Sequence, residues 1–268
     1  MDDGSKVLLR LGTSSWSVDS WVGVFYPPDS QSPQYLSFYA QKYNCVEIDN
    51  TFYRIPSSAM VRKWYEDTPA GFIFTAKVPR IITHEKMLEN CQEDLTAFLK
   101  AMEVLKDKRG PLLLQFPYFN KTAFPSADDF LARLSPFLKE LSQDWRWALE
   151  IRNKWWINRR LLDLLREHKL AFALIDQAWM PRIGQLLKKH DLDTTDFIYI
   201  RWLGDRKGIE AMTTVWDKVV VDRRSDLQEW VIPVRNWLQK TRAVYGFFNN
   251  HYAGHAPASL EMFQQMLG

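Results

Sequence analysis

Eight short apolar runs, rich in β-branched and aromatic residues, recur along the whole chain, and each precedes a polar loop and a segment with helical spacing. The runs span residues 7–11, 45–48, 72–76, 112–115, 147–151, 171–175, 197–200 and 244–248. Several are apolar at consecutive positions, as expected for parallel strands that are covered on both faces. This regular alternation predicts repeated βα units.

The segments between the runs carry helix signals. Residues 85–106 place apolar side chains at three- and four-residue spacing, and Gly110-Pro111 follows them. Residues 33–43 follow Ser32, a predicted N-cap, and Pro33 suits the first helical position. The other predicted helices span residues 57–67, 126–141, 157–168, 225–240 and 257–267, and the helical pattern is weakest around 180–190.

Eight predicted strands with intervening helices favour one α/β fold, a single (β/α)8 TIM-type barrel over residues 1–268. No Gly/Ser-rich linker or change of composition divides the chain. A doubly wound α/β fold is the alternative. Its dinucleotide fingerprint GxGxxG is absent, because Gly12 stands alone after the first run, and no GxxxxGK[ST] sequence occurs.

Charge and targeting signals narrow the functional classes. The 35 basic and 32 acidic residues give a formal net charge of +3, which does not by itself indicate a nucleic-acid or membrane partner. Neither a signal peptide nor about 18 uninterrupted apolar residues occurs, so the sequence predicts a cytoplasmic protein without a membrane partner. Cys45 and Cys91 lie outside metal-binding spacings and are expected to be reduced.

Polar side chains stand at the ends of all eight predicted strands, which converge on one mouth in a barrel. They are Ser15, Trp16, Glu47, Asp49, Lys77, Gln115, Glu150, Arg152, Asp176, Arg201, Asn249 and Asn250. A charge inside an apolar run costs several kcal/mol when unpaired, so the charged members need one another or a ligand. They therefore form either a buried ion-pair network or a site, and a site is the preferred hypothesis.

Two carboxylates and three cations at a mouth suit acid–base chemistry of the hydrolase or isomerase type. Glu47 and Glu150 are assigned as acid and base, and Asp176 positions a base or completes a metal site. The remaining polar residues bind the substrate, with Lys77, Arg152 and Arg201 on its anionic group. The expected ligand is a small anionic molecule, phosphorylated or polyhydroxylated.

Two alternatives stay open. Glu47, Asp49, Glu150 and Asp176 could supply oxygen ligands to Mg²⁺ or Mn²⁺. The chain also has 12 Trp residues, a supply of stacking surfaces for nucleic-acid bases, but its basic residues form dispersed pairs rather than a stripe. Six Trp residues fall just beyond strand ends: Trp16, Trp21, Trp155, Trp156, Trp179 and Trp202.

The sequence resembles the domain-of-unknown-function family 72, the YecE-like proteins, over essentially the whole chain. The matching stretches are LGTSSW at 11–16, WVGVFYP at 21–27, VEIDNTFYR at 46–54, GPLLLQFP at 110–117, EIR at 150–152, YIR at 199–201 and NN at 249–250. The resemblance implies a TIM-type barrel and an intracellular protein. It implies no established reaction.

The chain departs from that family's pattern at three positions. The resemblance leads us to expect Asn where Asp49 stands, and His where Asn153 and Leu203 stand. If either His shuttles protons in relatives, this chain has lost that group. Barrels of similar layout include sugar isomerases and endonuclease-IV-like phosphoesterases. The latter bind three metal ions with a His-rich set of ligands, and this sequence lacks such a set.

Overall fold

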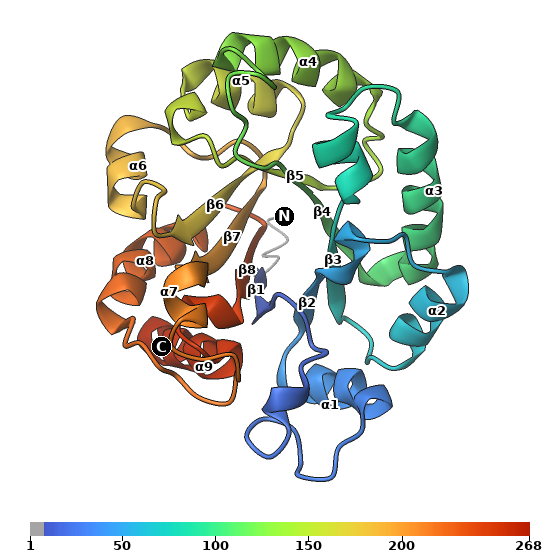
Figure 1. Ribbon diagram of the computed structural model, residues 1–268, viewed down its shortest axis with the longest axis vertical. Helices are drawn as coiled ribbons and strands as arrows, with labels where there is room; N and C mark the ends of the chain where they lie inside the picture. The colour runs from blue at the N-terminus through green and yellow to red at the C-terminus, as the bar shows by residue number, and fades with distance from the viewer. Residues whose placement is uncertain (1–7) are drawn as a thin grey trace, which may run out of the picture.

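The computed structural model describes residues 8–268 and confirms the predicted TIM-type barrel (Figure 1). Eight strands pair in parallel in the order β1-β8-β7-β6-β5-β4-β3-β2. Their bounds are β1 Leu8–Thr13, β2 Cys45–Ile48, β3 Ile73–Lys77, β4 Arg109–Gln115, β5 Trp147–Glu150, β6 Ala171–Gln177, β7 Phe197–Gly204 and β8 Ala243–Phe248.

The helices lie around the outside of the strands (Figure 1). Their bounds are α1 Tyr35–Lys42, α2 Ser58–Glu66, α3 Gln92–Met102, α4 Ala127–Glu140, α5 Arg159–Glu167, α6 Ile183–Lys189, α7 Arg206–Glu210, α8 Arg224–Trp237 and α9 Ala256–Leu267. Three helices begin after an N-cap residue whose side chain accepts a hydrogen bond from a backbone amide of the first turn. These residues are Ser57 before α2, Ser126 before α4 and Asn158 before α5.

The predicted helix over 85–106 is wrong in its first part. A π-helical turn covers Ile81–Glu85, and α3 begins only at Gln92. Between them Met87, Leu88 and Asn90 have positive φ angles of 46°, 71° and 47°, a conformation that a right-handed helix does not contain. The regular helix after β3 therefore begins only after this break.

The barrel interior is packed with side chains, as its apolar runs predict. Alternate residues of β2 and β4–β8 meet inside it: Cys45, Leu113, Ala148, Ala171, Ala173, Phe197, Tyr199, Ala243, Tyr245 and Phe247. A larger apolar cluster lies between the strands and the helices. Past this packed layer, the inward-facing rows continue into polar side chains at the carboxyl ends of the strands.

Strands β1 and β2 form the two ends of the hydrogen-bonded order, and they meet at a seam that lacks a backbone ladder among the described residues. Gly12 permits this contact, because a Cβ atom there would lie 2.2 Å from the carbonyl oxygen of Cys45. The Tyr39 hydroxyl of α1 accepts a hydrogen bond from the Thr13 amide (2.8 Å) and donates one to the Cys45 carbonyl (3.2 Å). One side chain thus joins the two strands.

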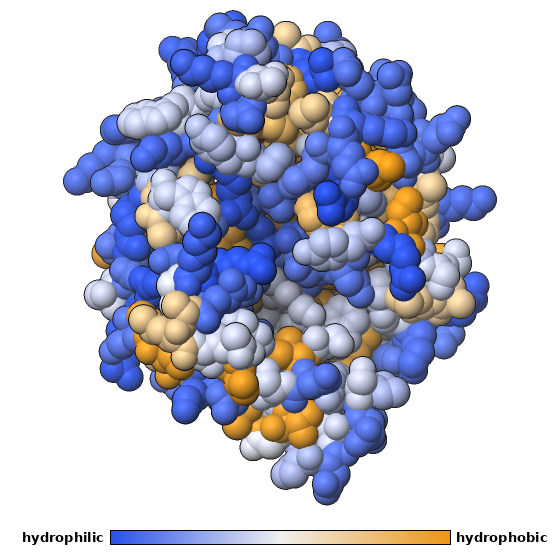
Figure 2. Space-filling model, viewed as in Figure 1, coloured by the Kyte–Doolittle hydropathy of each residue, from blue (hydrophilic) through white to orange (hydrophobic). Residues whose placement is uncertain are grey.

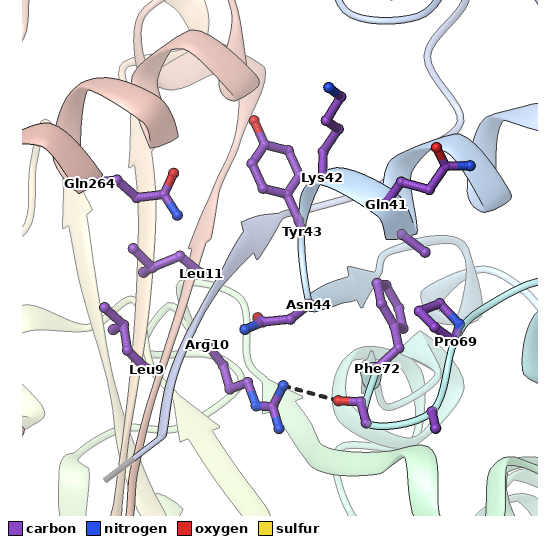
Figure 3. Close-up of a pocket in the computed structure, with 13 residues that line it drawn as sticks. Leu9, Arg10, Leu11, Gln41, Lys42, Tyr43, Asn44, Pro69, Phe72 and Gln264 are labelled. Atoms are coloured by element: carbon purple, nitrogen blue, oxygen red, sulfur yellow. Dashed lines mark hydrogen bonds between the residues drawn. The ribbon is translucent and has the colours of Figure 1, made fainter. Parts of the chain in front are cut away.

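A hollow opens at the amino-terminal end of this seam (Figure 3). The start of β1 and the turn before β2 border it, and Arg10 donates a hydrogen bond to the Gly71 carbonyl (3.0 Å) across its base. This end is opposite the carboxyl ends of the strands, where barrel enzymes build their sites.

Within residues 8–268, no helix is long and apolar enough to cross a membrane.

The seam predicts an asymmetric response to added methyl groups. We expect Gly12→Ala to lower the free energy of unfolding by about 2–3 kcal/mol, because the new Cβ forces β1 away from β2. The matched control is Gly184→Ala in α6, where a Cβ meets nothing within 4 Å, and there stability is unchanged or rises by up to about 1 kcal/mol. Urea denaturation measures both, and equal effects would contradict the close approach at the seam.

Candidate functional site at the barrel mouth

A buried ion-pair cluster forms the floor of the mouth. The Arg201 guanidinium on β7 donates to Glu47 Oε1 on β2, from Nη2 at 2.8 Å and from Nε at 3.1 Å. Its Nη1 donates to Glu150 Oε2 on β5 at 2.7 Å. The three side chains are at most 1% exposed, so one cation joins two carboxylates from other strands in the barrel interior. This outcome matches the ion-pair network that the sequence left open.

The remaining carboxylate oxygens of the floor also have donors. Glu47 Oε2 accepts from the Tyr199 hydroxyl at 2.7 Å, and Glu150 Oε1 accepts from Nε and Nη2 of Arg152 at 2.6 Å. Burial would raise the pKa of Glu150, but the adjacent Arg152 and Arg201 outweigh it and lower the pKa to about 2. Glu150 therefore stays ionised at neutral pH and holds its two arginines in place.

Above the floor lies a pocket of about 390 Å³ at the carboxyl ends of the strands. The face seen in Figure 2 is hollowed near its centre, and mostly hydrophilic residues border the hollow. The residues lining the pocket are Asp49, Phe52, Tyr53, Lys77, His84, Gln115, Arg152, Gln177, Trp179, Arg201, Leu203, Arg206, Asn249 and His251. Loops after seven of the strands or the strand ends themselves supply them.

The pocket lining is rich in cations. Lys77 forms an ion pair with Asp49, the only carboxylate among the described lining residues, and its Nζ lies 5.4 Å from the centroid of the Phe52 ring. Arg152 donates to the side-chain carbonyl of Gln177, and Arg206 pairs with Glu210 at 2.7 Å. The carboxylates that balance Arg152 and Arg201 are buried beneath the pocket, so a ligand meets the cations first.

Two imidazoles complete the lining. His84, in the π-helical turn after β3, has its Nδ1 2.8 Å from the Thr83 hydroxyl. Burial, with Arg80, Lys77 and Arg152 nearby, lowers the pKa of His84 to about 4. His251 lies with Nε2 3.1 Å from Glu210 Oε1, and burial lowers its pKa as well. Both rings are therefore neutral near pH 7.

The structure places eight of the predicted site residues in the mouth, either on the pocket lining or in the floor beneath it. Those on the lining are Asp49, Lys77, Gln115, Arg152, Arg201 and Asn249. Glu47 and Glu150 lie in the floor, where every carboxylate oxygen is already bonded. Asn249 in addition accepts a hydrogen bond from the His251 amide at 2.9 Å, which orders the loop after β8.

The prediction that Asp176 faces the mouth is wrong. Its carboxylate lies on the outer side of β6, where it accepts hydrogen bonds from Trp230 Nε1 of α8 (2.9 Å) and from the Tyr252 hydroxyl (3.3 Å). Burial raises its pKa. Ala171 and Ala173 of β6 face the barrel interior, so strand alternation directs Gln177 inward and Asp176 outward, and Gln177 lines the pocket.

Three further predicted residues lie outside the pocket lining. Ser15 adopts a positive φ of 133° and accepts a hydrogen bond from the Ser17 amide. The Trp16 ring is buried edge-on against Trp64 of α2, with ring centroids 5.6 Å apart. The carbonyl oxygen of the Asn250 side chain accepts from the amide of Ala256, the first residue of α9, at 2.9 Å. Each has a structural role beside the mouth.

The lining also contains residues that the strand ends did not identify. Phe52 and Tyr53 follow β2 in a short 3-10 turn, within the stretch that carries the family resemblance. Gln177 and Arg206 had no distinguishing sequence signal. Leu203, where His was expected, presents an apolar side chain to the pocket. Asn153, at the other such position, instead binds the backbone amide and carbonyl of Phe119 at 2.9 and 2.8 Å.

The hypothetical Mg²⁺ or Mn²⁺ ligand set is not assembled. The Arg201 guanidinium binds both Glu47 and Glu150, and Asp176 faces α8. Over the whole described range, no group of three or more His, Cys, Asp or Glu side chains is placed to hold a metal ion.

Comparisons with known proteins agree with this fold. The profile of a family described as "Protein of unknown function DUF72" matches residues 10–268. "UPF0759 protein YecE" of Escherichia coli (strain K12) is 30% identical over 147 residues, 54% of this chain and 49% of that protein. "UPF0759 protein YunF" of Bacillus subtilis (strain 168) is 23% identical, covering 97% of this chain and 95% of that protein.

A solved structure is also similar over nearly its full length. The crystal structure of a DUF72 family protein from Thermotoga maritima MSB8 superposes with a TM-score of 0.76 at 25% sequence identity, covering 97% of this chain and 99% of the other. The matched length differs among relatives: the match spans about half the length of the Escherichia coli protein and nearly the whole Bacillus subtilis protein.

The floor predicts a large effect of removing its cation. We expect Arg201→Met to lower the free energy of unfolding by about 3–5 kcal/mol, since it leaves Glu47 and Glu150 buried without their partner. Arg206→Met is the matched control, because its exposed pair with Glu210 contributes less than about 1 kcal/mol. Adding Glu47→Gln and Glu150→Gln to Arg201→Met recovers part of the loss. Denaturation midpoints that leave Arg201→Met as stable as the control would refute this role.

The low pKa of His84 predicts a pH dependence of stability. The unfolded chain binds a proton at His84 near its ordinary pKa of 6.5, whereas the folded protein binds it only near pH 4. The free energy of unfolding therefore falls as the pH drops from 6.5 to about 4. We expect a shallower fall for His84→Gln, measured by urea denaturation across that range. Identical slopes in the two proteins would mean that His84 titrates alike in both states.

Proposed function

Since the chain belongs to the DUF72 family, a family of unknown function, we propose from its own residues that the mouth pocket is an enzymatic site. In this proposal the pocket binds a small anionic molecule, phosphorylated or polyhydroxylated, and performs acid–base chemistry on it. The observation that carries the proposal is the separation of charges in the mouth. Cations line the pocket, while two of the carboxylates that balance them are buried in the floor.

The anionic group of the ligand binds beside Lys77 and Arg152 in this proposal. Both side chains line the pocket and keep part of their surface open, 11% for Lys77 and 16% for Arg152. Glu150 fixes the Arg152 guanidinium from one side and leaves it able to meet an oxyanion from the other. Arg201 lies deeper, and its guanidinium is bonded to both glutamates. It therefore contributes to the electrostatic potential of the pocket without contacting the ligand.

The hydroxyl groups of the ligand meet the side-chain amides of Gln115, Gln177 and Asn249, which come from three different strand ends. A pocket of about 390 Å³ falls within the range of small-molecule sites. Convergent amides above a charged floor are suited to a ligand with several hydroxyl groups. Gln177 and Asn249 accept hydrogen bonds at their oxygens and keep their NH2 groups as donors, whereas Gln115 donates to the Phe116 carbonyl and keeps its oxygen as an acceptor.

Proton transfer in this proposal falls to the lining, not to the floor. Glu47 and Glu150 have all their oxygens bonded, so we assign them to positioning Arg201 and Arg152. His84 is a neutral imidazole on the lining and can accept a proton, and Asp49 is the one carboxylate among the described lining residues. A bound anion raises the pKa of His84 toward the working pH, since opposite charges favour the protonated ring.

A small molecule is favoured over nucleic acid by the burial of the tryptophans. Trp16, Trp21 and Trp202 are buried in the core, and the Trp156 ring stacks on Phe130 with centroids 5.2 Å apart. Three of the six tryptophans predicted to follow strand ends are therefore buried, and Trp156 is half-buried. The two that remain, Trp155 and Trp179, do not make the extended stacking surface that a polymer requires.

A ligand screen tests the proposal. We expect a panel of phosphorylated sugars, screened by thermal shift, to include one that adds roughly 2.7 kcal/mol of stability at about a hundred times its dissociation constant. In Lys77→Gln the affinity for that compound falls at least about tenfold, because the anion loses a cation on the pocket lining.

Lys63→Gln is the matched control, since Lys63 is an exposed lysine of α2 whose carboxylate partner is Asp67. It leaves the affinity unchanged. A ligand that binds Lys77→Gln and wild type equally tightly would place its anion elsewhere, and the proposed site would be abandoned.

A further inference from the structure

Two aromatic side chains stand exposed beside the mouth. Trp155, in the 3-10 turn Lys154–Trp156 after β5, is 83% exposed, and Trp179, just after β6, is 49% exposed. Two hollows of about 390 and 400 Å³ flank them, and both tryptophans line both hollows. We call Trp155 and Trp179 the tryptophan shelf. Exposing two such large apolar rings side by side has no stability benefit, which indicates a binding surface.

The shelf is continuous with the mouth pocket. Trp179 lines the mouth pocket as well as both hollows, and Arg152 lines the mouth pocket and one of the hollows. A ligand whose anionic group lies on Arg152 therefore reaches the shelf without leaving the protein surface. The two surfaces can contact different parts of one molecule.

The shelf is surrounded by cations. Lys121, Lys154 and Arg152 line one hollow and Lys154 and Lys189 the other, and no acidic side chain is among the described residues that line either. Lys154 Nζ lies 5.1 Å from the centroid of the Trp155 ring. The surface thus combines flat π faces with positive charge, which suits a planar, electron-rich group attached to an anion.

A sugar ring fits this surface less well than an aromatic base. Sugar hydroxyls need carboxylate or amide acceptors, and the side-chain amide oxygens of the hollows already accept hydrogen bonds. The Asn153 oxygen accepts from the Phe119 amide at 2.9 Å, and the Gln185 oxygen accepts from the Arg182 amide at 3.3 Å. Stacking of a base requires only the ring faces that the shelf offers.

We propose that the tryptophan shelf binds the base of a nucleotide whose phosphate lies in the mouth pocket on Lys77 and Arg152. This inference rests on the proposed function and narrows its ligand class from phosphorylated small molecules to nucleoside monophosphates. The phosphate supplies the attraction to the mouth, and stacking on the shelf supplies the preference for a base.

Calorimetric titration with two probes separates the two surfaces. We expect adenosine 5′-monophosphate to bind wild type at least about tenfold more tightly than ribose 5-phosphate, which has the phosphate but no base. Trp155→Ala weakens the nucleotide by about tenfold and leaves ribose 5-phosphate unchanged, whereas Trp155→Phe keeps most of the affinity. Ile232→Ala, which removes an exposed apolar side chain on α8, is the matched control and changes neither affinity.

Each other outcome decides against the inference in its own way. Equal affinity of the two probes for wild type would remove the shelf from the ligand site and leave the phosphate site intact. Failure of both probes to bind would overturn the phosphate site together with the shelf. A single-stranded oligonucleotide that binds at least about a hundredfold more tightly than the mononucleotide would assign the shelf to a polymer.

Discussion

The pairing of Arg201 with Glu47 and Glu150 is the constraint on which the mouth depends. Three charges in a space at most 1% exposed to solvent persist because the one guanidinium meets both carboxylates at hydrogen-bonding distance. The pairs tie β7 to β2 and β5, so they fix the relative positions of strands that are not neighbours in the barrel. They also set the depth of the pocket, because the guanidinium forms part of its floor.

The buried charges of the floor also orient a cation of the pocket lining. Glu150 bonds Arg201 with one oxygen and Arg152 with the other, so a buried carboxylate orients a cation that is partly open to the pocket. Lys77 and Asp49 form a second partly open ion pair on the pocket lining. The result is a lining in which cations outnumber carboxylates, next to a shelf of exposed tryptophans that shares Arg152 with it.

Much of the site could be predicted from strand ends, and the exceptions have local causes. Asp49, Lys77 and Gln115 continue inward-facing rows, so strand alternation places them in the mouth. Asp176 was misplaced although the alternation of β6 is regular: Ala171 and Ala173 face the interior, so Gln177 follows them inward and Asp176 faces outward. His84 reaches the mouth through a π-helical turn that lies just before the segment for which the apolar spacing predicted a regular helix.

The sequence alone determined the barrel and the ring of polar residues at its mouth, because strand and helix periodicities and the positions of strand ends are local properties of the chain. Only the tertiary structure decided which carboxylates a ligand can reach. Glu47, Glu150 and Arg201 are far apart in the chain, and their pairing depends on distances across the barrel that no local pattern encodes. The buried carboxylates of Glu47 and Glu150 therefore position the arginines, because all their oxygens are bonded and none is free to contact a ligand in the pocket.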